Sequence, residues 1–263
     1  MIRVAVTGAA GRMGRLVVQN VVNDEETELV QAFDVREVGK DAGELAGVGR
    51  IGVEITHASE MEKVLDADVL IDFTVADAAV ENIRIASQKG VKLVVGTTGF
   101  TEEQRKLIEE YCRNVPAVIT PNFSVGVNVF WKLIEFAVKY LSEYDIEIVE
   151  MHHRFKKDAP SGTAVKAAEV LVNALKEMGI ERKIVHGRSG ICPRGDEIGV
   201  FAVRGGDVVG DHTVYFIGMG ERIEITHRAH SRQAFAGGAL KAAKWVAKVD
   251  KPGIYGMDDV LGL

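Results

Sequence analysis

Apolar positions follow two different spacings along the first half of the chain, which indicates alternating strands and helices. Short continuous apolar runs, rich in β-branched residues, predict strands, and longer segments with apolar residues three or four positions apart predict helices. The predicted strands span residues 2–7, 29–33, 69–73, 91–95 and 117–120, and the predicted helices span residues 12–22, 78–88 and 102–112. This order is typical of repeated βαβ units. Because the strand runs are continuously apolar, we expect a parallel sheet covered by helices on both faces.

The pattern changes after Phe123, where a second structural region begins. An amphipathic helix is predicted over residues 127–141, then a strand over 145–151 and a helix over 163–178. Three strands follow, at residues 198–204, 207–217 and 221–230. Glycine-containing turns separate them, so we expect an antiparallel meander. A last helix, over residues 234–248, carries small residues and is expected to return to the first sheet.

Charge, composition and cysteine content narrow the class of protein. The 263 residues include 32 Lys and Arg against 38 Asp and Glu, a formal net charge of −6, which favours neither nucleic acid nor anionic lipid as a partner. With 47% hydrophobic residues, the chain has ample material for packed cores and is unlike a disordered protein. Cys112 and Cys192 form no disulfide or zinc-ribbon pattern, which fits a reducing cytosol.

The N-terminal segment enters a strand-like run directly, without the charged and apolar regions of a signal peptide. No apolar run reaches the roughly 18 residues that span a bilayer. We therefore expect a soluble, cytoplasmic protein without membrane contact.

A glycine loop between the first predicted strand and the first predicted helix is the first candidate site. It consists of Gly8, Ala9, Ala10, Gly11, Arg12, Met13 and Gly14. Glycines in this position let the backbone approach a pyrophosphate at the helix N-terminus. The spacing is GxxGxxG, one residue longer than the usual dinucleotide motif. A glycine turn without a ligand is the alternative interpretation.

Asp34 strengthens the dinucleotide interpretation. It ends the second predicted strand about 20 positions after Gly14, where a carboxylate can accept hydrogen bonds from both adenosine ribose hydroxyls. Asp34 as an ordinary turn residue is the alternative.

Two further strand ends are expected at the same edge of the sheet, where open α/β folds bind ligands. They comprise Gly96, Thr97, Thr98 and Gly99, and Thr120, Pro121, Asn122 and Phe123. Their small residues and their hydroxyl and amide groups suit the nicotinamide ribose and carboxamide. Taken alone, either segment fits an ordinary turn.

A basic segment in the second region is the most unusual stretch of the chain. It contains His152, His153, Arg154, Lys156 and Lys157. Holding these charges together is costly unless an anionic ligand compensates them. Ser161, Gly162 and Thr163 then begin a helix whose N-terminal amides suit a carboxylate. A solvated basic loop is the alternative.

No metal site is predicted from the histidines. Adjacent histidines on an extended segment point to opposite faces, so His152 and His153 do not bind one zinc ion together. For the remaining histidines, structural roles in the core or on the surface are the default. They are His57, His186, His212, His227 and His230.

Several motifs taken together resemble the dihydrodipicolinate reductase family of lysine biosynthesis. They are VAVTGAAGRMG, IDFT, GTTGF, PNFSVGVNV, EMHHRFKKDAPSGTA, GDHTVYF and GERIEITHRAHSR, and they run from the first strand to the final helix. The resemblance implies an α/β fold with a Rossmann-like dinucleotide-binding domain, residues 1–125 plus 234–263. It also implies a second α+β domain, residues 126–233, with a mixed, largely antiparallel sheet that binds substrate and forms a homotetramer.

The resemblance also implies the reaction and the roles of single residues. NADH or NADPH reduces 4-hydroxy-tetrahydrodipicolinate, a cyclic dicarboxylate imine, to tetrahydrodipicolinate with loss of water, in the diaminopimelate pathway. Gly8 to Met13 hold the pyrophosphate, Asp34 the adenosine ribose, and Gly96 to Thr98 with Thr120 to Phe123 the nicotinamide half. His152 is the acid/base residue, Lys156 the proton donor and His153 a substrate contact, while Gly162 and Thr163 bind a substrate carboxylate.

This sequence departs from the family pattern at two positions. Some relatives place an arginine directly after the ribose-binding acid, where it meets the 2′-phosphate of NADPH, but here that residue is Val35, followed by Arg36. We therefore expect use of both cofactors, with NADH at least as good as NADPH. Phe155 replaces a residue that is often histidine, which removes one titratable group from the segment.

Two other functions are also compatible with the sequence. One is another nicotinamide-dependent reductase of a dicarboxylic precursor, and the other is a non-catalytic dinucleotide sensor. The lack of an acylating cysteine signal weighs against the first alternative. A sensor has no need for Lys156 and His152 beside Gly162 and Thr163.

Overall fold

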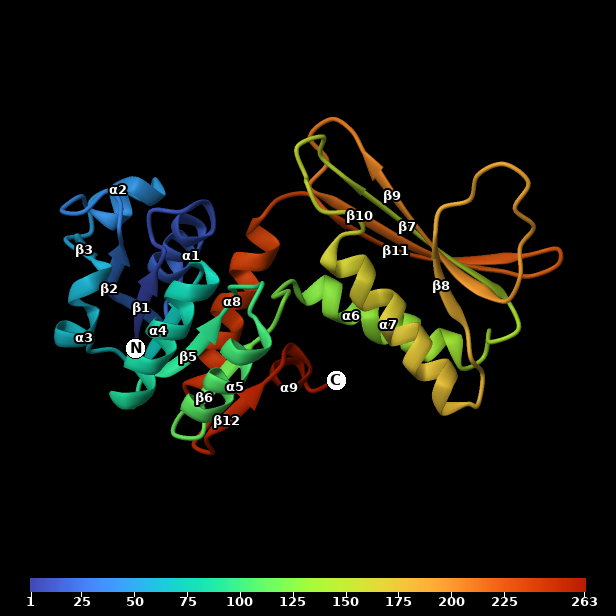
Figure 1. The fold of residues 1–263 in the computed structure, drawn as a ribbon. Helices are drawn as coiled ribbons and strands as arrows, with labels where there is room; N and C mark the ends of the chain where they lie inside the picture. Colours follow the sequence, from blue (N-terminus) through green and yellow to red (C-terminus); the bar gives the residue numbers. More distant parts are fainter. The chain divides into compact units, whose positions relative to one another are not determined.

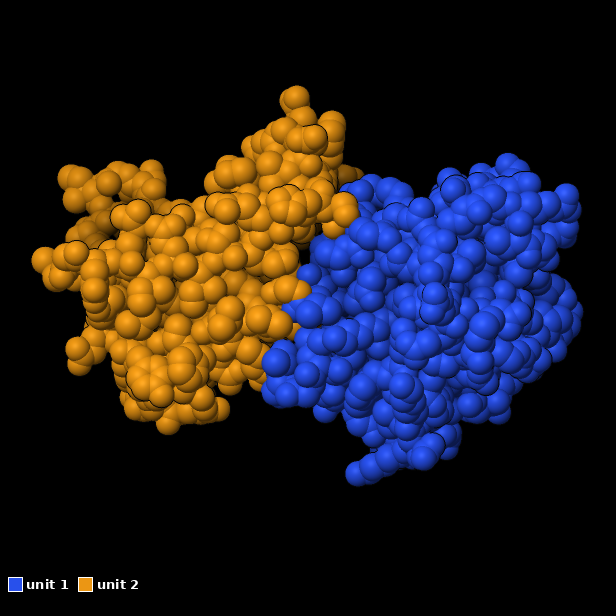
Figure 2. All heavy atoms as spheres, turned by 180° about the vertical axis from the view of Figure 1, so that it is seen from behind, with its two compact units in different colours: residues 1–125, 232–263 blue, residues 126–231 orange.

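Two compact units make up the chain in a computed structural model that describes all 263 residues. Unit 1 joins Met1–Val125 to Arg232–Leu263, and unit 2 is Gly126–Ser231 (Figure 2). No helix combines the length and the apolarity that a bilayer crossing requires.

A seven-stranded parallel sheet forms the centre of unit 1. Its strands are β1 Ile2–Thr7, β2 Thr27–Asp34, β3 Ile55–His57, β4 Val69–Asp72, β5 Lys92–Val95, β6 Pro116–Ile119 and β12 Gly253–Tyr255. They lie in the order β12-β6-β5-β4-β1-β2-β3, and every pair is parallel. Without β12 this is the strand order of a Rossmann fold, whose ligands bind at the carboxyl edge of the strands.

Helices cover both faces of this sheet, as predicted. They are α1 Arg12–Asn23, α2 Ala42–Ala46, α3 Met61–Val64, α4 Ala76–Gln88, α5 Glu102–Tyr111, α8 Gln233–Val246 and α9 Met257–Leu261, with a 3-10 turn at Ala58–Glu60. Alternate residues of β1 enter opposite cores: Val4 and Val6 pack with α1 and α8, and Ala5 packs with α4 and α5. All three are fully buried, so the strand shows no polar alternation.

Helix α8 returns to the first sheet, which confirms the prediction for the final helix (Figure 1). Its buried face consists largely of small residues, including Ala236, Ala239 and Ala242. The backbone comes so close to the loop after β6 that a Cβ at Gly238 would lie 1.7 Å from the carbonyl oxygen of Phe123. Small residues in α8 therefore permit close packing beneath the carboxyl end of β6.

Unit 2 contains a mixed five-stranded sheet with two helices on one face (Figure 1). The strands are β7 Asp145–His152, β8 Lys183–His186, β9 Glu197–Arg204, β10 Gly210–Ile217 and β11 Arg222–Ala229, and the helices are α6 Val125–Val138 and α7 Gly162–Glu177. Ile146, Ile148 and Phe216 are fully buried beneath the helices. The sheet order is β11-β10-β7-β9-β8, with two antiparallel and two parallel pairings.

The predicted meander is wrong at its first turn. Strand β9 pairs in parallel with β7 and β8, not with β10, because β7 lies between β9 and β10. Residues after β9 also pair with the segment after β7, since Gly205 N donates to His152 O and His153 N donates to Val208 O. Strand β10 therefore begins at Gly210 and not at Asp207. The pairing of β10 with β11 agrees with the prediction.

Candidate active site

The glycine loop of unit 1 is packed so tightly that side chains would not fit. Gly8 has φ +76°, and a Cβ there would lie 2.5 Å from the carbonyl oxygen of Phe73. A Cβ at Gly14 would lie 2.0 Å from the carbonyl oxygen of Gly8. Gly11 is the N-cap of α1 and offers no side-chain cap, so the first amides of the helix suit an anion. These features fit a dinucleotide pyrophosphate.

Asp34 is held beside this loop at the end of β2. Only 6% of its surface is exposed, and its carboxylate accepts hydrogen bonds from Ala10 N and Arg36 N, each at 3.0 Å. The Nε atom of the exposed Arg36 lies 3.9 Å from the same carboxylate. A cavity of about 290 Å³ opens here, lined by Thr7, Gly8, Gly11, Asp34, Val35, Arg36, Ala58, Phe73, Thr74, Val75, Ala78 and Asn82.

A second cavity, of about 410 Å³, continues along the edge of the sheet and is also lined by Gly11, Phe73, Thr74 and Val75. Its remaining lining residues are Arg12, Met13, Ala76, Gly96, Thr97 and Thr98. The structure thus brings most of the predicted cofactor residues to two adjoining cavities. Ala9 and Ala10 are buried within the loop itself.

Asp72, at the end of β4, organises this edge, and the sequence interpretation did not single it out. Its buried carboxylate accepts hydrogen bonds from Thr74 Oγ1 and Thr97 Oγ1, both at 2.8 Å, and from Asn82 Nδ2 at 2.7 Å. Burial raises the pKa of Asp72, although these hydrogen bonds act in the opposite direction. In the sequence, the signal for this role was a single aspartate at the end of an apolar run.

The segment after β6 lines neither cavity. Thr120 is buried, Pro121 is exposed and Asn122 is half-buried. Phe123 as a whole is 2% exposed and belongs to the core, and its ring centroid lies 6.0 Å from that of Phe73. Phe123 therefore offers almost no exposed surface for a cofactor contact.

In unit 2, a buried carboxylate holds the predicted acid/base histidine. Glu150 is wholly buried on β7, and its Oε2 lies 2.6 Å from Nδ1 of His152 at the end of the same strand. Arg204 of β9 donates two hydrogen bonds to this carboxylate, both at 2.8 Å, and Ser161 N donates a third at 2.9 Å. Burial raises the pKa of Glu150, but the hydrogen bonds from His152, Arg204 and Ser161 outweigh it and lower the pKa to about 2.

The Nε2 atom of His152 lies next to a glycine. A Cβ at Gly210 would lie 3.0 Å from this nitrogen. Because the ionised Glu150 accepts a hydrogen bond from Nδ1–H of His152, Nε2 is the nitrogen left for proton exchange. The geometry suits a general acid or base.

Lys156 and the start of α7 complete the basic site. The ammonium group of Lys156 lies 2.9 Å from Asp158 Oδ2, and the lysine side chain is 21% exposed. Ser161 is the N-cap of α7, with Gly162 exposed and Thr163 half-buried in the first turn. His153 is half-buried, and its Nδ1 atom is buried without a hydrogen-bond partner.

His212 on β10 is a buried neighbour that the sequence interpretation assigned only a default role. Its Nε2 lies 3.0 Å from Ser161 Oγ, and its ring centroid lies 5.1 Å from that of His152. Burial, and then the positive charge of His152, lower the pKa of His212 to about 3. His212 is therefore neutral near pH 7. His212 lies two and four positions before the buried Val214 and Phe216, so all three point to the same, inner face of the sheet. This spacing was the signal available in the sequence.

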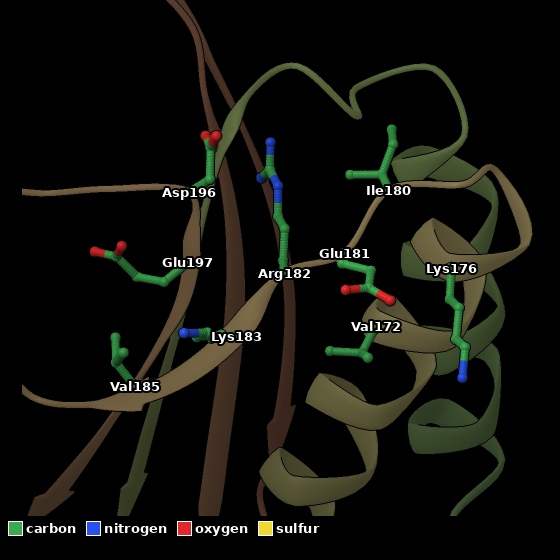
Figure 3. A pocket seen from close by; sticks show the side chains of 9 residues that line it. All are labelled: Val172, Lys176, Ile180, Glu181, Arg182, Lys183, Val185, Asp196 and Glu197. Atoms are coloured by element: carbon green, nitrogen blue, oxygen red, sulfur yellow. The ribbon is translucent and has the colours of Figure 1, made fainter.

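A further cavity, of about 550 Å³, lies elsewhere in unit 2 and contains none of the predicted site residues. Figure 3 shows its lining side chains, which come from α7, from β8 and the segment before it, and from the start of β9. Arg182 donates to the carbonyl oxygens of Ser142 and Tyr144, at 2.7 and 2.8 Å. No group of three or more His, Cys, Asp or Glu residues is placed to hold a metal ion.

Comparisons with known proteins cover nearly the whole chain. Residues 2–123 match the family described as dihydrodipicolinate reductase, N-terminus, and residues 126–261 match dihydrodipicolinate reductase, C-terminus. The 4-hydroxy-tetrahydrodipicolinate reductase of Archaeoglobus fulgidus is 62% identical over 98% of this chain and 99% of its own length. The enzyme of the same name from Methanosarcina barkeri is 58% identical over the full length of both chains.

Solved structures agree with these matches. A dipicolinate-bound dihydrodipicolinate reductase from Paenisporosarcina sp. TG-14 has a TM-score of 0.77 at 28% identity, over 97% of each chain. A scyllo-inositol dehydrogenase from Lactobacillus casei, with bound NAD(H), has a TM-score of 0.58 over 93% of this chain and 87% of its own. At 13% identity that second likeness concerns the fold alone. The chain belongs to the dihydrodipicolinate reductase family.

Proposed function

We propose that this chain catalyses the reduction of 4-hydroxy-tetrahydrodipicolinate to tetrahydrodipicolinate, with loss of water, using NADH or NADPH in lysine biosynthesis. The observation that carries the proposal is the basic site of unit 2, where His152 is fixed by Glu150 close to the start of α7. A dicarboxylate substrate requires such cationic and amide groups. Family membership supports the same reaction.

In unit 1, three groups of residues are proposed to bind three parts of the dinucleotide cofactor. The glycine loop from Gly8 to Met13 binds the pyrophosphate through its backbone. Asp34 accepts hydrogen bonds from the adenosine ribose. Residues 96–98 and 120–123 contact the nicotinamide half, the latter through the exposed Pro121 and the half-buried Asn122. The bound nicotinamide supplies the hydride.

In unit 2, the proposed roles follow from charge and position. The amides of Gly162 and Thr163 at the start of α7 bind one substrate carboxylate, and His153 contacts the substrate. Lys156 provides the proton that the reduced ring needs, and Nε2 of His152 accepts or donates a proton beside it. The positive field of this segment favours the doubly anionic substrate.

Cofactor choice depends on Asp34, Val35 and Arg36. A 2′-phosphate would bring negative charge close to the carboxylate of Asp34, which favours NADH. Arg36 is 70% exposed at its side chain, so it is free to turn towards a 2′-phosphate. We therefore expect both cofactors to work, with NADH at least as good as NADPH.

Assembly and location are proposed on the family resemblance. We propose a homotetramer formed through unit 2, the substrate-binding unit, and a cytoplasmic location. The sheet edges at β8 and β11 are the parts of unit 2 that most need a partner.

Steady-state kinetics with both cofactors, on one preparation, test the proposed function. We expect oxidation of NADH and NADPH that requires freshly prepared 4-hydroxy-tetrahydrodipicolinate. Cofactor that binds but is never oxidised in the presence of this substrate would instead support a dinucleotide sensor.

A further inference from the structure

We propose that Glu150 and Arg204 form a positioning pair, which orients His152 for proton transfer and fixes it relative to the start of α7. This inference rests on the proposed function, because it assigns the two residues to the same reaction. Neither residue needs to touch the substrate. Their effect is exerted through His152, Ser161 and the segment that carries Lys156.

The contacts of Glu150 leave its carboxylate little freedom. Four donor contacts converge on the two oxygens: one from His152, one from Ser161 N and two from Arg204. The paired bonds from the guanidinium group fix the plane of the carboxylate. A wholly buried carboxylate costs stability unless it is paired and hydrogen-bonded in this way. Because such a buried ion pair adds little net stability, the contact of Glu150 with His152 points to a role in positioning the histidine.

Both oxygens of Glu150 act on the site. Oε2 accepts a hydrogen bond from Nδ1–H of His152, which sets the tautomer and places Nε2 next to Gly210, where no side chain intervenes. Oε1 receives the backbone N–H of Ser161, the N-cap of α7. One rigid group thus sets the distance between the acid/base nitrogen and the proposed carboxylate-binding helix start.

Arg204 extends the same arrangement to Lys156. Its guanidinium group donates a hydrogen bond to the backbone carbonyl oxygen of Asp158 at 2.6 Å. The side chain of Asp158 forms an ion pair with Lys156 at 2.9 Å. Arg204 therefore links the acid/base residue to the partner of the proposed proton donor.

The charges around His152 come from four elements. Glu150 lies on its own strand, Arg204 on β9, His212 on β10, and Lys156 in the segment that follows β7. His212 is neutral near pH 7, and of these four residues Glu150 carries the negative charge, while the carboxylate of Asp158 pairs with Lys156. Glu150→Gln therefore removes the negative charge that His152 contacts while keeping an oxygen or an amide in the same place.

The test compares Glu150→Gln, Arg204→Lys and Arg204→Met with the control Glu147→Gln. Glu147 lies on the same strand and is also ion-paired and largely buried, but on the opposite face of the sheet. We expect Glu150→Gln to lower kcat about 10- to 100-fold with the NADH dissociation constant unchanged. Arg204→Lys should retain more activity than Arg204→Met, and Glu147→Gln should retain full activity.

Nitrogen-15 NMR of the His152 imidazole gives a readout that does not depend on turnover. The wild-type ring should carry its proton on Nδ1 at neutral pH, and Glu150→Gln should add a population protonated on Nε2. An unchanged tautomer together with kcat within twofold of wild type in Glu150→Gln overturns the proposal. If that variant does not fold, equal kcat and an equal His152 spectrum in Arg204→Met and wild type overturn it.

If the proposed function is wrong, the experiments give a different result. In that case wild-type protein does not oxidise NADH with the substrate, while the NMR comparison still decides whether the pair orients His152.

Discussion

Lys156 belongs to unit 2 and is not among the residues that line the two proposed cofactor cavities of unit 1. We predict that Lys156→Ala lowers turnover by about 10²- to 10⁴-fold, the usual contribution of a positioned general acid, while NADH affinity scarcely changes. Cofactor fluorescence titration and turnover on the same variant measure the two effects. Lys157→Ala, at the exposed neighbouring lysine, is the control. Equal losses in affinity and turnover would make Lys156 a structural or cofactor residue.

His212 should make unit 2 sensitive to mild acid. Burial lowers its pKa from 6.5 to about 3, so protonation of the unfolded chain below pH 6.5 favours unfolding. The stability that neutral His212 contributes is present above pH 6.5 and is lost as the pH falls towards 3. Between pH 7 and pH 5 the loss should be about 2 kcal/mol.

Urea unfolding at pH 7 and pH 5 tests this prediction in a Trp245→Phe background, where Trp131 of unit 2 is the remaining tryptophan. His212→Gln should reduce the difference between the two pH values. The lowered pKa of Glu150 acts below pH 4.5, outside this range. The same loss with and without the substitution would show that His212 is not the responsible group.

The site residues that could be predicted from the sequence are charged residues, histidines or glycines that occur at a recognisable spacing. His152, Lys156, Asp34 and the glycine loop are of this kind. Glu150 and Arg204 escaped notice because their meaning depends on the pairing of β7 with β9, whose residues are more than fifty positions apart. Asp72 likewise acquires its role from Thr97 on another strand end.

At the scale of elements, the approach of α8 to the loop after β6 gives a matched pair of substitutions. A Cβ at Gly238 would lie 1.7 Å from Phe123 O, whereas a Cβ at the exposed Gly237 would meet nothing within 4 Å. We predict that Gly238→Ala destabilises unit 1 by about 1–3 kcal/mol or more. Gly237→Ala should stabilise it by about 0.5–1 kcal/mol, because alanine is the better helix former.

Thermal unfolding followed by Trp245 fluorescence, in a Trp131→Phe background, measures both variants. The two midpoints should move in opposite directions from the parent. Similar midpoints for the two alanine variants would contradict the close packing of α8 against Phe123.

Helices and strands with a clear pattern of apolar residues could be predicted from the sequence. The pairing of the strands in the second sheet could not. Continuous apolar runs such as β4 and β5 require burial on both faces, which leaves few arrangements. In unit 2, the Gly205–Gly206 turn suggested a hairpin between β9 and β10. Long-range packing placed β7 between them instead, where Ile146 and Ile148 lie in the core beneath α6 and α7.

At the scale of the whole molecule, assembly is the main prediction. We expect residues 207–230, which include β10 and β11, to build a subunit interface, because exposed sheet edges are usually paired or covered. Light scattering at micromolar concentration should give the mass of a tetramer. A fully active monomer would rule out this interface.

Transfer of deuterium from labelled cofactor tests the central claim most directly. We predict that NADH carrying deuterium at its transferred position converts 4-hydroxy-tetrahydrodipicolinate into tetrahydrodipicolinate one mass unit heavier, with the label at ring carbon 4. The Lys156→Ala variant should form this product far more slowly while binding the cofactor normally. Unlabelled product, or no product from wild-type protein that binds NADH, would contradict the account.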